Sequence, residues 1–280
     1  MSGLVAAEEL AARLGEPGLA VLEVAFDPSD GAFRAAHVPG SRWAHWKALL
    51  WHDTDRRFPD QETLARRLGA LGVGGEDELV LVGDPIQFAA YAYWVLRMLG
   101  RPARILDGGR ARWLAGGFPV EPGMPAPEPK EHPPLAGAPA FAPLIGRAAV
   151  LAALGGDSLI LDFRSPEEYR GERVAPLTAP IDHGAERPGR IPGARHLYFE
   201  RLLAEDCTFR SPDELREVLR ETGLLNGGDV IAYCRLSHRA ALGWFALHEL
   251  LGHERVRVYD GSWTEWGSIV GMPVEREAGT

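Results

Sequence analysis

The fold class of this chain is decided by one stretch, Val230-Ile231-Ala232-Tyr233-Cys234-Arg235-Leu236-Ser237-His238-Arg239. It opens with an apolar run typical of a buried parallel strand, passes through a short polar loop and enters an apolar helical stretch over 240–251. Further strand-like runs lie at 159–163 and 256–259. This strand–helix–strand order predicts an α/β fold with right-handed crossovers and a parallel sheet flanked by helices.

The same organisation occurs twice in the chain. Residues 37–41, His-Val-Pro-Gly-Ser, match residues 190–194, Arg-Ile-Pro-Gly-Ala, and the Asp-Gly turn at 107–108 matches the one at 260–261. The segment between the two halves is rich in proline, which is typical of an extended linker. The sequence therefore predicts two domains of one type joined by a linker, and the ranges are 1–120, 121–143 for the linker, and 144–280.

Charge and cysteine content exclude several classes of protein. The 280 residues include 30 basic and 39 acidic ones, and the net charge of −9 argues against a protein that binds nucleic acid or anionic membranes. The apolar run at 88–99 is too short to span a membrane and contains Arg97. Two cysteines are too few for a secreted disulfide framework, and the N-terminus lacks a signal-peptide pattern, so we expect a cytoplasmic location.

Cys234 is the candidate nucleophile. In an open α/β sheet, ligands bind at the carboxyl ends of the strands, and Cys234 directly follows the first strand quoted above. Unpaired N–H groups in a loop that opens a helix favour a thiolate, and Arg235, His238 and Arg239 add positive charge for an anionic substrate. The alternative is a buried structural cysteine. Cys207 has no such surroundings, so we expect it to be inert.

The first half of the chain lacks a nucleophile at the matching position. The sequence comparison assigns Asp84, after the strand-like run at 79–82, as the counterpart of Cys234. The loop there is also shorter, and a carboxylate would repel an anion. We therefore expect the first half to be an inactive domain that forms a wall of the pocket.

The chain resembles the rhodanese family of sulfurtransferases in its two-domain form, and most of all the bacterial thiosulfate sulfurtransferases. The resemblance covers essentially the whole chain and rests on four motifs, at residues 162–171, 190–194, 234–239 and 259–263. It implies that Cys234 takes the outer sulfur of thiosulfate as a persulfide and releases sulfite. The sulfur would then pass to cyanide or to a thiol, including the thiol of a protein acceptor.

The resemblance and the chemistry of the loop together predict a site. Cys234 is its catalytic residue, and Asp162 supports it as a buried hydrogen-bond acceptor that holds the cysteine loop in shape. The predicted substrate-binding residues are Phe26, Arg164, Arg235, Leu236, Ser237, His238 and Arg239. No cofactor and no metal are expected, because the cysteines and histidines do not have the spacing of metal ligands.

The sequence differs from other members of the family at two places in this site. Leu236 stands where animal-type enzymes carry a lysine, and Glu168 stands where some members carry an arginine. The insertion over 171–190 is either a lip of the pocket or a solvated surface loop.

Three alternative functions stay open from the sequence. A 3-mercaptopyruvate sulfurtransferase is disfavoured, because enzymes of that branch carry a Gly-rich loop closed by a threonine, which this sequence lacks. A cysteine phosphatase needs a longer loop than the four residues that separate Cys234 from Arg239. A non-catalytic persulfide carrier or sensor would use the same cysteine.

Overall fold

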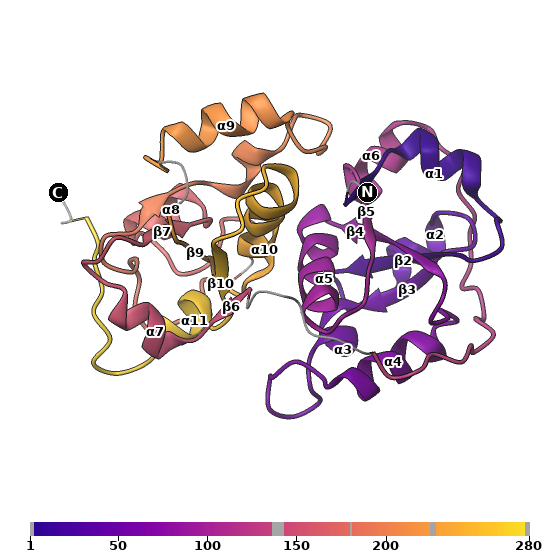
Figure 1. The fold of residues 1–280 in the computed structure, drawn as a ribbon, viewed down its shortest axis with the longest axis horizontal. Coiled ribbons are helices and arrows are strands. Elements are labelled where there is room, and N and C mark those ends of the chain that lie inside the picture. Colours follow the sequence, from indigo (N-terminus) through magenta and orange to yellow (C-terminus); the bar gives the residue numbers. More distant parts are fainter. Residues whose placement is uncertain (1–2, 136–142, 180, 225–227, 278–280) are drawn as a thin grey trace. The chain divides into compact units, whose positions relative to one another are not determined.

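The computed structural model describes residues 3–135, 143–179, 181–224 and 228–277, and it divides into two compact units (Figure 1). The first unit comprises Met1–Phe141 together with Glu205–Thr208, and the second comprises Ala142–Ala204 together with Phe209–Thr280. Each unit contains a five-stranded sheet whose strands all pair in parallel. The predicted α/β class with two similar domains is confirmed.

The sheet of the first unit has the strand order β1-β5-β4-β2-β3. Its strands are β1 (Leu4–Val5), β2 (Leu19–Ala25), β3 (Arg42–His45), β4 (Glu78–Asp84) and β5 (Arg104–Leu106). Its helices are α1 (Ala7–Arg13), α2 (Gly31–Ala35), α3 (Trp46–Leu50), α4 (Gln61–Ala70), α5 (Ile86–Met98) and α6 (Gly109–Ala115).

The sheet of the second unit repeats this order as β6-β10-β9-β7-β8. Its strands are β6 (Leu144–Ile145), β7 (Leu159–Asp162), β8 (Arg195–His196), β9 (Val230–Tyr233) and β10 (Val256–Tyr259). Its helical segments are α7 (Arg147–Ala152), α8 (Pro166–Arg170), the 3₁₀ turn η1 (Phe199–Leu202), α9 (Pro212–Arg220), α10 (His238–Phe245), the π-helical turn η2 (Ala246–Leu250) and α11 (Ser262–Trp266).

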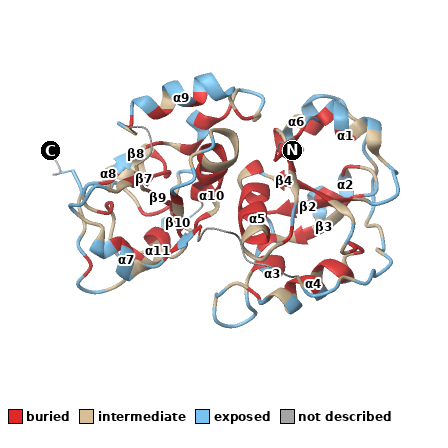
Figure 2. Cartoon of the chain, viewed as in Figure 1, coloured by how far each residue is buried: buried red, intermediate tan, exposed pale blue. Residues whose placement is uncertain are grey.

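Burial follows the apolar pattern of each element (Figure 2). Helix α5 is apolar around almost its whole circumference and is buried along nearly its whole length. Helix α9 is amphipathic instead, so it buries Leu215 and Leu219 and exposes most of its other side chains. None of the helices in the described part of the chain is long and apolar enough to cross a membrane.

Strand register defines which residues of the two units correspond. Glu23 on β2 and Asp162 on β7 are counterparts, because each pairs with the second residue of the next strand, β3 or β8. On the other side, Glu23 pairs with Val82 on β4, and Asp162 pairs with Tyr233 on β9. Val82 and Tyr233 are therefore counterparts as well.

This register corrects the assignment of Asp84. The residue after Val82 is Gly83, so Gly83 occupies the place that Cys234 has in the second unit. A Cβ on Gly83 would lie 2.6 Å from the Cα of Ile86, which leaves no room for a side chain. The comparison of sequences was wrong by one residue because β4 continues through Asp84, whereas β9 ends before its cysteine.

The proline-rich segment lies along the first unit where the structure describes it. Glu121 forms an antiparallel bridge with His37, and the N–H of Lys130 donates to the carbonyl of Gly69 (3.0 Å). The part of the predicted linker at 136–142 lies outside the described residues. Glu205–Thr208 belongs to the first unit, which the sequence did not predict. There, Oδ2 of Asp206 lies 3.4 Å from Nε of Arg112.

Candidate active site

Cys234 lies at the carboxyl end of β9, the central strand of the second sheet, and is buried. Its N–H donates to Oγ of Ser262 (3.2 Å), and its carbonyl accepts from the N–H of Trp263 (2.9 Å). Ser262 Oγ in turn donates to the carbonyl of Tyr259 (2.8 Å). The start of α11 therefore fixes both backbone polar groups of the cysteine.

The residues after Cys234 are held by the same neighbouring segment. The N–H and the hydroxyl of Thr264 both donate to the carbonyl of Arg235, at 3.2 and 2.9 Å. Ser237 Oγ lies 2.5 Å from the carbonyl and 2.7 Å from the carboxylate of Asp260. Ser237 has a φ of +73°, and this left-handed residue turns the chain into α10. Leu236 between them is half-buried.

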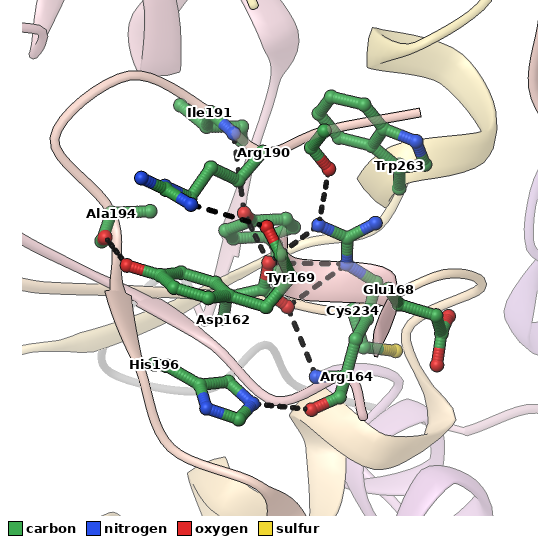
Figure 3. Close-up of polar contacts among 12 residues, drawn as sticks. Asp162, Arg164, Glu168, Tyr169, Arg190, Ile191, Ala194, His196, Cys234 and Trp263 are labelled. Atoms are coloured by element: carbon green, nitrogen blue, oxygen red, sulfur yellow. Dashed lines mark hydrogen bonds and ion pairs between the residues drawn. The ribbon is translucent and has the colours of Figure 1, made fainter. Parts of the chain in front are cut away.

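Asp162 is a buried acceptor at the end of β7, next to β9 (Figure 3). Its carboxylate accepts from Nε and Nη2 of Arg164 (2.9 and 2.6 Å) and from the hydroxyl of Tyr233 (2.5 Å). Burial and the charge of Asp162 raise the pKa of Tyr233 well above its ordinary value, so the phenol stays a donor. Asp162 thus holds the residue that precedes Cys234, and a cation compensates its charge.

Arg164 was predicted to bind substrate, but its buried charge is compensated by Asp162. Besides Asp162, it donates to the carbonyl of Gly189 (2.7 Å), and its guanidinium lies 4.6 Å from the ring centroid of Trp263. Burial lowers the pKa of Arg164, but Asp162 outweighs this and raises it, so the side chain is a cation. We assign Arg164 to the support of the site.

Glu168 on α8 forms a buried ion pair with Arg239 on α10. The two nitrogens Nη1 and Nη2 donate to the two carboxylate oxygens at 2.6 and 2.9 Å. Glu168 also accepts from the N–H of Ser165 (3.1 Å), as part of the capping box that starts α8. Burial lowers the pKa of Arg239, but Glu168 and Cys234 raise it above its ordinary value. The charge that was predicted to bind substrate is therefore offset by a carboxylate, and the sequence alone does not predict this pairing.

Arg235 and His238 are the other two residues of the loop that were predicted to be cations. Arg235 donates from Nη2 to Nδ1 and to the carbonyl of His183 (2.7 and 2.8 Å), within the insertion over 171–190. His238, at the start of α10, is not a cation at neutral pH, contrary to the sequence expectation. Its burial and the charges of Arg239 and Arg235 lower its pKa well below the ordinary value.

Phe26, the last of the predicted site residues, and Cys207, the second cysteine, belong to the first unit. Phe26 directly follows β2, is 56% exposed and has its ring centroid 5.2 Å from that of Phe88. Its assignment to the substrate site stays a prediction. Cys207 belongs to the segment Glu205–Thr208 and is partly exposed.

Among the described residues there is no group of three or more histidine, cysteine or acidic side chains placed to hold a metal ion.

The paired sheets and the cysteine loop match one known family model. The model of the rhodanese-like domain matches this chain twice, over residues 6–116 and 147–269. The chain belongs to the rhodanese-like family. Its two matches coincide with the two sheets, so this is a tandem rhodanese-like protein, and the activity class of its relatives is sulfur transfer.

Curated relatives of this rhodanese-like protein extend over nearly its full length. A protein of Saccharopolyspora erythraea, provisionally named a thiosulfate sulfurtransferase, is 39% identical over 277 residues, which cover 97% of this chain and 95% of the relative. The sulfur carrier protein TtuD of Thermus thermophilus is 33% identical, covering 98% of this chain and 96% of the carrier. SseA of Escherichia coli, described as a 3-mercaptopyruvate sulfurtransferase of rhodanese fold, superposes with a TM-score of 0.75 at 25% identity, covering 94% and 99%.

Proposed function

We propose that this rhodanese-like protein is a thiosulfate sulfurtransferase that works through a persulfide of Cys234. The observation that carries the proposal is the position of Cys234, at the carboxyl end of the central strand, with its backbone fixed by α11 and with Arg235 next to it. The name of the relative from Saccharopolyspora erythraea supports thiosulfate as the donor. A small anionic donor and a cyanide or thiol acceptor are the partners that this chemistry needs, and it needs no cofactor.

The reaction has two displacement steps at sulfur. The Cys234 thiolate attacks the outer sulfur of thiosulfate, the S–S bond of the donor breaks, and sulfite leaves with the bonding electron pair. Cyanide or an acceptor thiolate then attacks the outer sulfur of the cysteine persulfide, and the Cys234 thiolate is regenerated. Positive charge beside the sulfur stabilises both the thiolate and the persulfide anion.

Intact mass measurement tests this proposal directly. After incubation with thiosulfate, the protein should gain the mass of one sulfur atom, and cyanide should remove it with the release of thiocyanate. The Cys234→Ser variant serves as the matched control and should show no gain. A wild-type protein whose mass does not change would refute the persulfide.

The likeness to TtuD favours a second candidate, a sulfur carrier that passes its persulfide to a protein acceptor. Both functions use Cys234, and turnover separates them. With thiosulfate and cyanide, a thiosulfate sulfurtransferase releases many equivalents of thiocyanate for each protein, whereas a carrier that thiosulfate does not reload releases about one. The two free cysteines are compatible with the cytoplasm, which we propose as the location.

A further inference from the structure

The insertion over 171–190 reaches the cysteine loop at Arg235. Nη2 of Arg235 donates to Nδ1 of His183 (2.7 Å) and to the carbonyl of the same residue (2.8 Å). The backbone of Gly184 lies against the guanidinium, since a Cβ there would lie 2.5 Å from Nη2 and 2.6 Å from Nε. Two hydrogen bonds and one close backbone contact thus define where this guanidinium lies.

The insertion is itself anchored on both sides of His183. Before it, the carboxylate of Asp182 accepts from the N–H groups of Val174 and Ala175, both at 2.9 Å. After it, the guanidinium of Arg187 donates to four carbonyls at the end of α11 and just beyond it, those of Trp266, Gly267, Ile269 and Met272. His183 and Gly184 therefore belong to a segment with defined contacts, and Arg235 is held against that segment.

Arg235 differs from the other two arginines near the cysteine in its charge balance. The charge of Arg239 is offset by Glu168, and the charge of Arg164 is offset by Asp162. In the part of the chain that the structure describes, Arg235 forms no ion pair with a carboxylate, and its hydrogen bonds go to the neutral acceptors of His183. Of these three arginines, Arg235 is therefore the one whose positive charge is not offset by a carboxylate among the described residues.

We propose that the insertion is part of the donor site, with His183 and Gly184 as positioning residues that hold Arg235 where it binds the oxyanion group of the sulfur donor. This inference rests on the proposed function and assigns to it the residues that set the affinity for a dianionic donor. It predicts that displacing Arg235 weakens binding of the donor more than it slows the attack of the thiolate. Both positioning residues act through Arg235.

The test compares two donors that share one reaction and differ in charge. Thiosulfate is a dianion, and methanethiosulfonate is a monoanion that offers the same kind of outer sulfur with a sulfinate leaving group. The rate of Cys234 persulfide formation is measured against the concentration of each donor. The variants are Gly184→Ala, His183→Ala and His183→Asn, in which the amide oxygen of asparagine replaces the acceptor Nδ1. Gly155→Ala is the matched control, because Gly155 also has a positive φ (+73°) but nothing lies within 4 Å of its added Cβ.

Gly184→Ala should raise the thiosulfate concentration at half-maximal rate about 10-fold, the loss expected for a displaced charge-assisted contact, with a maximal rate within about 3-fold of wild type. The same variant should raise the methanethiosulfonate concentration at half-maximal rate by a smaller factor. His183→Ala should act in the same direction, and His183→Asn should recover most of the loss. Gly155→Ala should behave as wild type.

Two results would overturn the inference for different reasons. Unchanged thiosulfate dependence in both Gly184→Ala and His183→Ala, in a protein that forms the persulfide, would remove the insertion from the donor site and leave the proposed function standing. A wild-type protein that accepts sulfur from neither donor would refute the proposed function and this inference with it. If Gly184→Ala does not fold, the comparison of His183→Ala with His183→Asn decides, because that pair changes one exposed side chain.

Discussion

The hydroxyl of Tyr233 donates a 2.5 Å hydrogen bond to Oδ2 of Asp162, and Cys234 is the next residue in the chain. The same hydroxyl accepts from the N–H of Ile191 (3.2 Å), so three segments meet at one phenol oxygen. The nucleophile is thereby tied, through its preceding residue, to the strand beside it and to the repeated Pro-Gly turn. The contact is buried and involves a charged acceptor, which makes it stronger than a neutral hydrogen bond.

Tyr233→Phe should therefore lower the free energy of unfolding of the second unit by about 1.5–3 kcal/mol, the range for a hydrogen bond to a charged group. Tyr169→Phe is the comparison, because that hydroxyl donates to the neutral carbonyl of Ala194 (2.8 Å) and its loss should cost about 0.5–1.5 kcal/mol. Denaturant unfolding followed by tryptophan fluorescence measures both. Equal losses in the two variants would show that the charge of Asp162 adds nothing to the Tyr233 contact.

Cys234→Ser should abolish sulfur transfer, whereas Cys207→Ser should leave it largely intact. The reason is that Cys234 lies in the loop beside Arg235, while Cys207 belongs to a segment of the other unit. The release of thiocyanate from thiosulfate and cyanide measures both variants. Substantial turnover by the Cys234 variant would contradict the assignment, and so would an equal loss in the Cys207 variant.

Breaking the ion pair of Glu168 and Arg239 from one side should destabilise the protein by about 3–5 kcal/mol, because the remaining charge would be buried without a partner. Arg239→Met and Glu168→Gln should each show this loss, and the double variant should recover much of it. A double-mutant cycle on unfolding free energies gives the coupling. Additive losses would show that the two charges do not depend on each other.

Variants of the same ion pair test whether Arg239 also binds the donor. If Arg239 binds the donor as predicted, Arg239→Ala should reduce thiosulfate turnover about 10²-fold, as for the loss of a contact of about 1.5–3 kcal/mol. The pair with Glu168 adds the expectation that the loss is partly structural, so Arg239→Ala combined with Glu168→Gln should turn over faster than Arg239→Ala alone. A double variant as slow as the single one would assign the whole effect to lost donor binding.

His37 in the first unit should contribute to stability and not to sulfur transfer. Its Nδ1 lies 3.0 Å from the carbonyl of Phe33, and its Nε2 lies 3.2 Å from Oε1 of Glu121. Arg190 makes the corresponding contact with Glu275 in the second unit. His37→Ala should lower the unfolding free energy by about 1–3 kcal/mol, as expected when a buried polar network loses a partner, with unchanged persulfide formation. His37→Arg should lose less stability, and a larger loss for arginine would contradict the correspondence.

The fold could be predicted from the sequence because its signals are local. The apolar run at 230–233, the helix after it and the repeated Pro-Gly and Asp-Gly turns are each formed by residues that are neighbours in the sequence. The correspondence of residues between the halves depends on strand register. The sequence alone therefore assigned Asp84 as the counterpart of Cys234, whereas the counterpart is Gly83.

The charge balance of the site depends on contacts between distant residues. Glu168 and Arg239 lie on different helices, and no spacing in the sequence relates them. Arg164 and Arg239 were both predicted to bind substrate because a sequence shows the cations near a motif but not the carboxylates that fold against them. Trp263 was visible in a motif, yet its place over Arg164 was not.

The tight turn at Gly83 leaves no room for a nucleophilic side chain at the place that Cys234 has in the second unit. Two residues separate Gly83 from the start of α5, whereas three separate Cys234 from the start of α10. A codon change to cysteine would place its Cβ 2.6 Å from Ile86, so a descendant would need to lengthen the turn before any thiol could be gained there. A second nucleophile in the first unit is therefore out of reach of a single substitution at this turn.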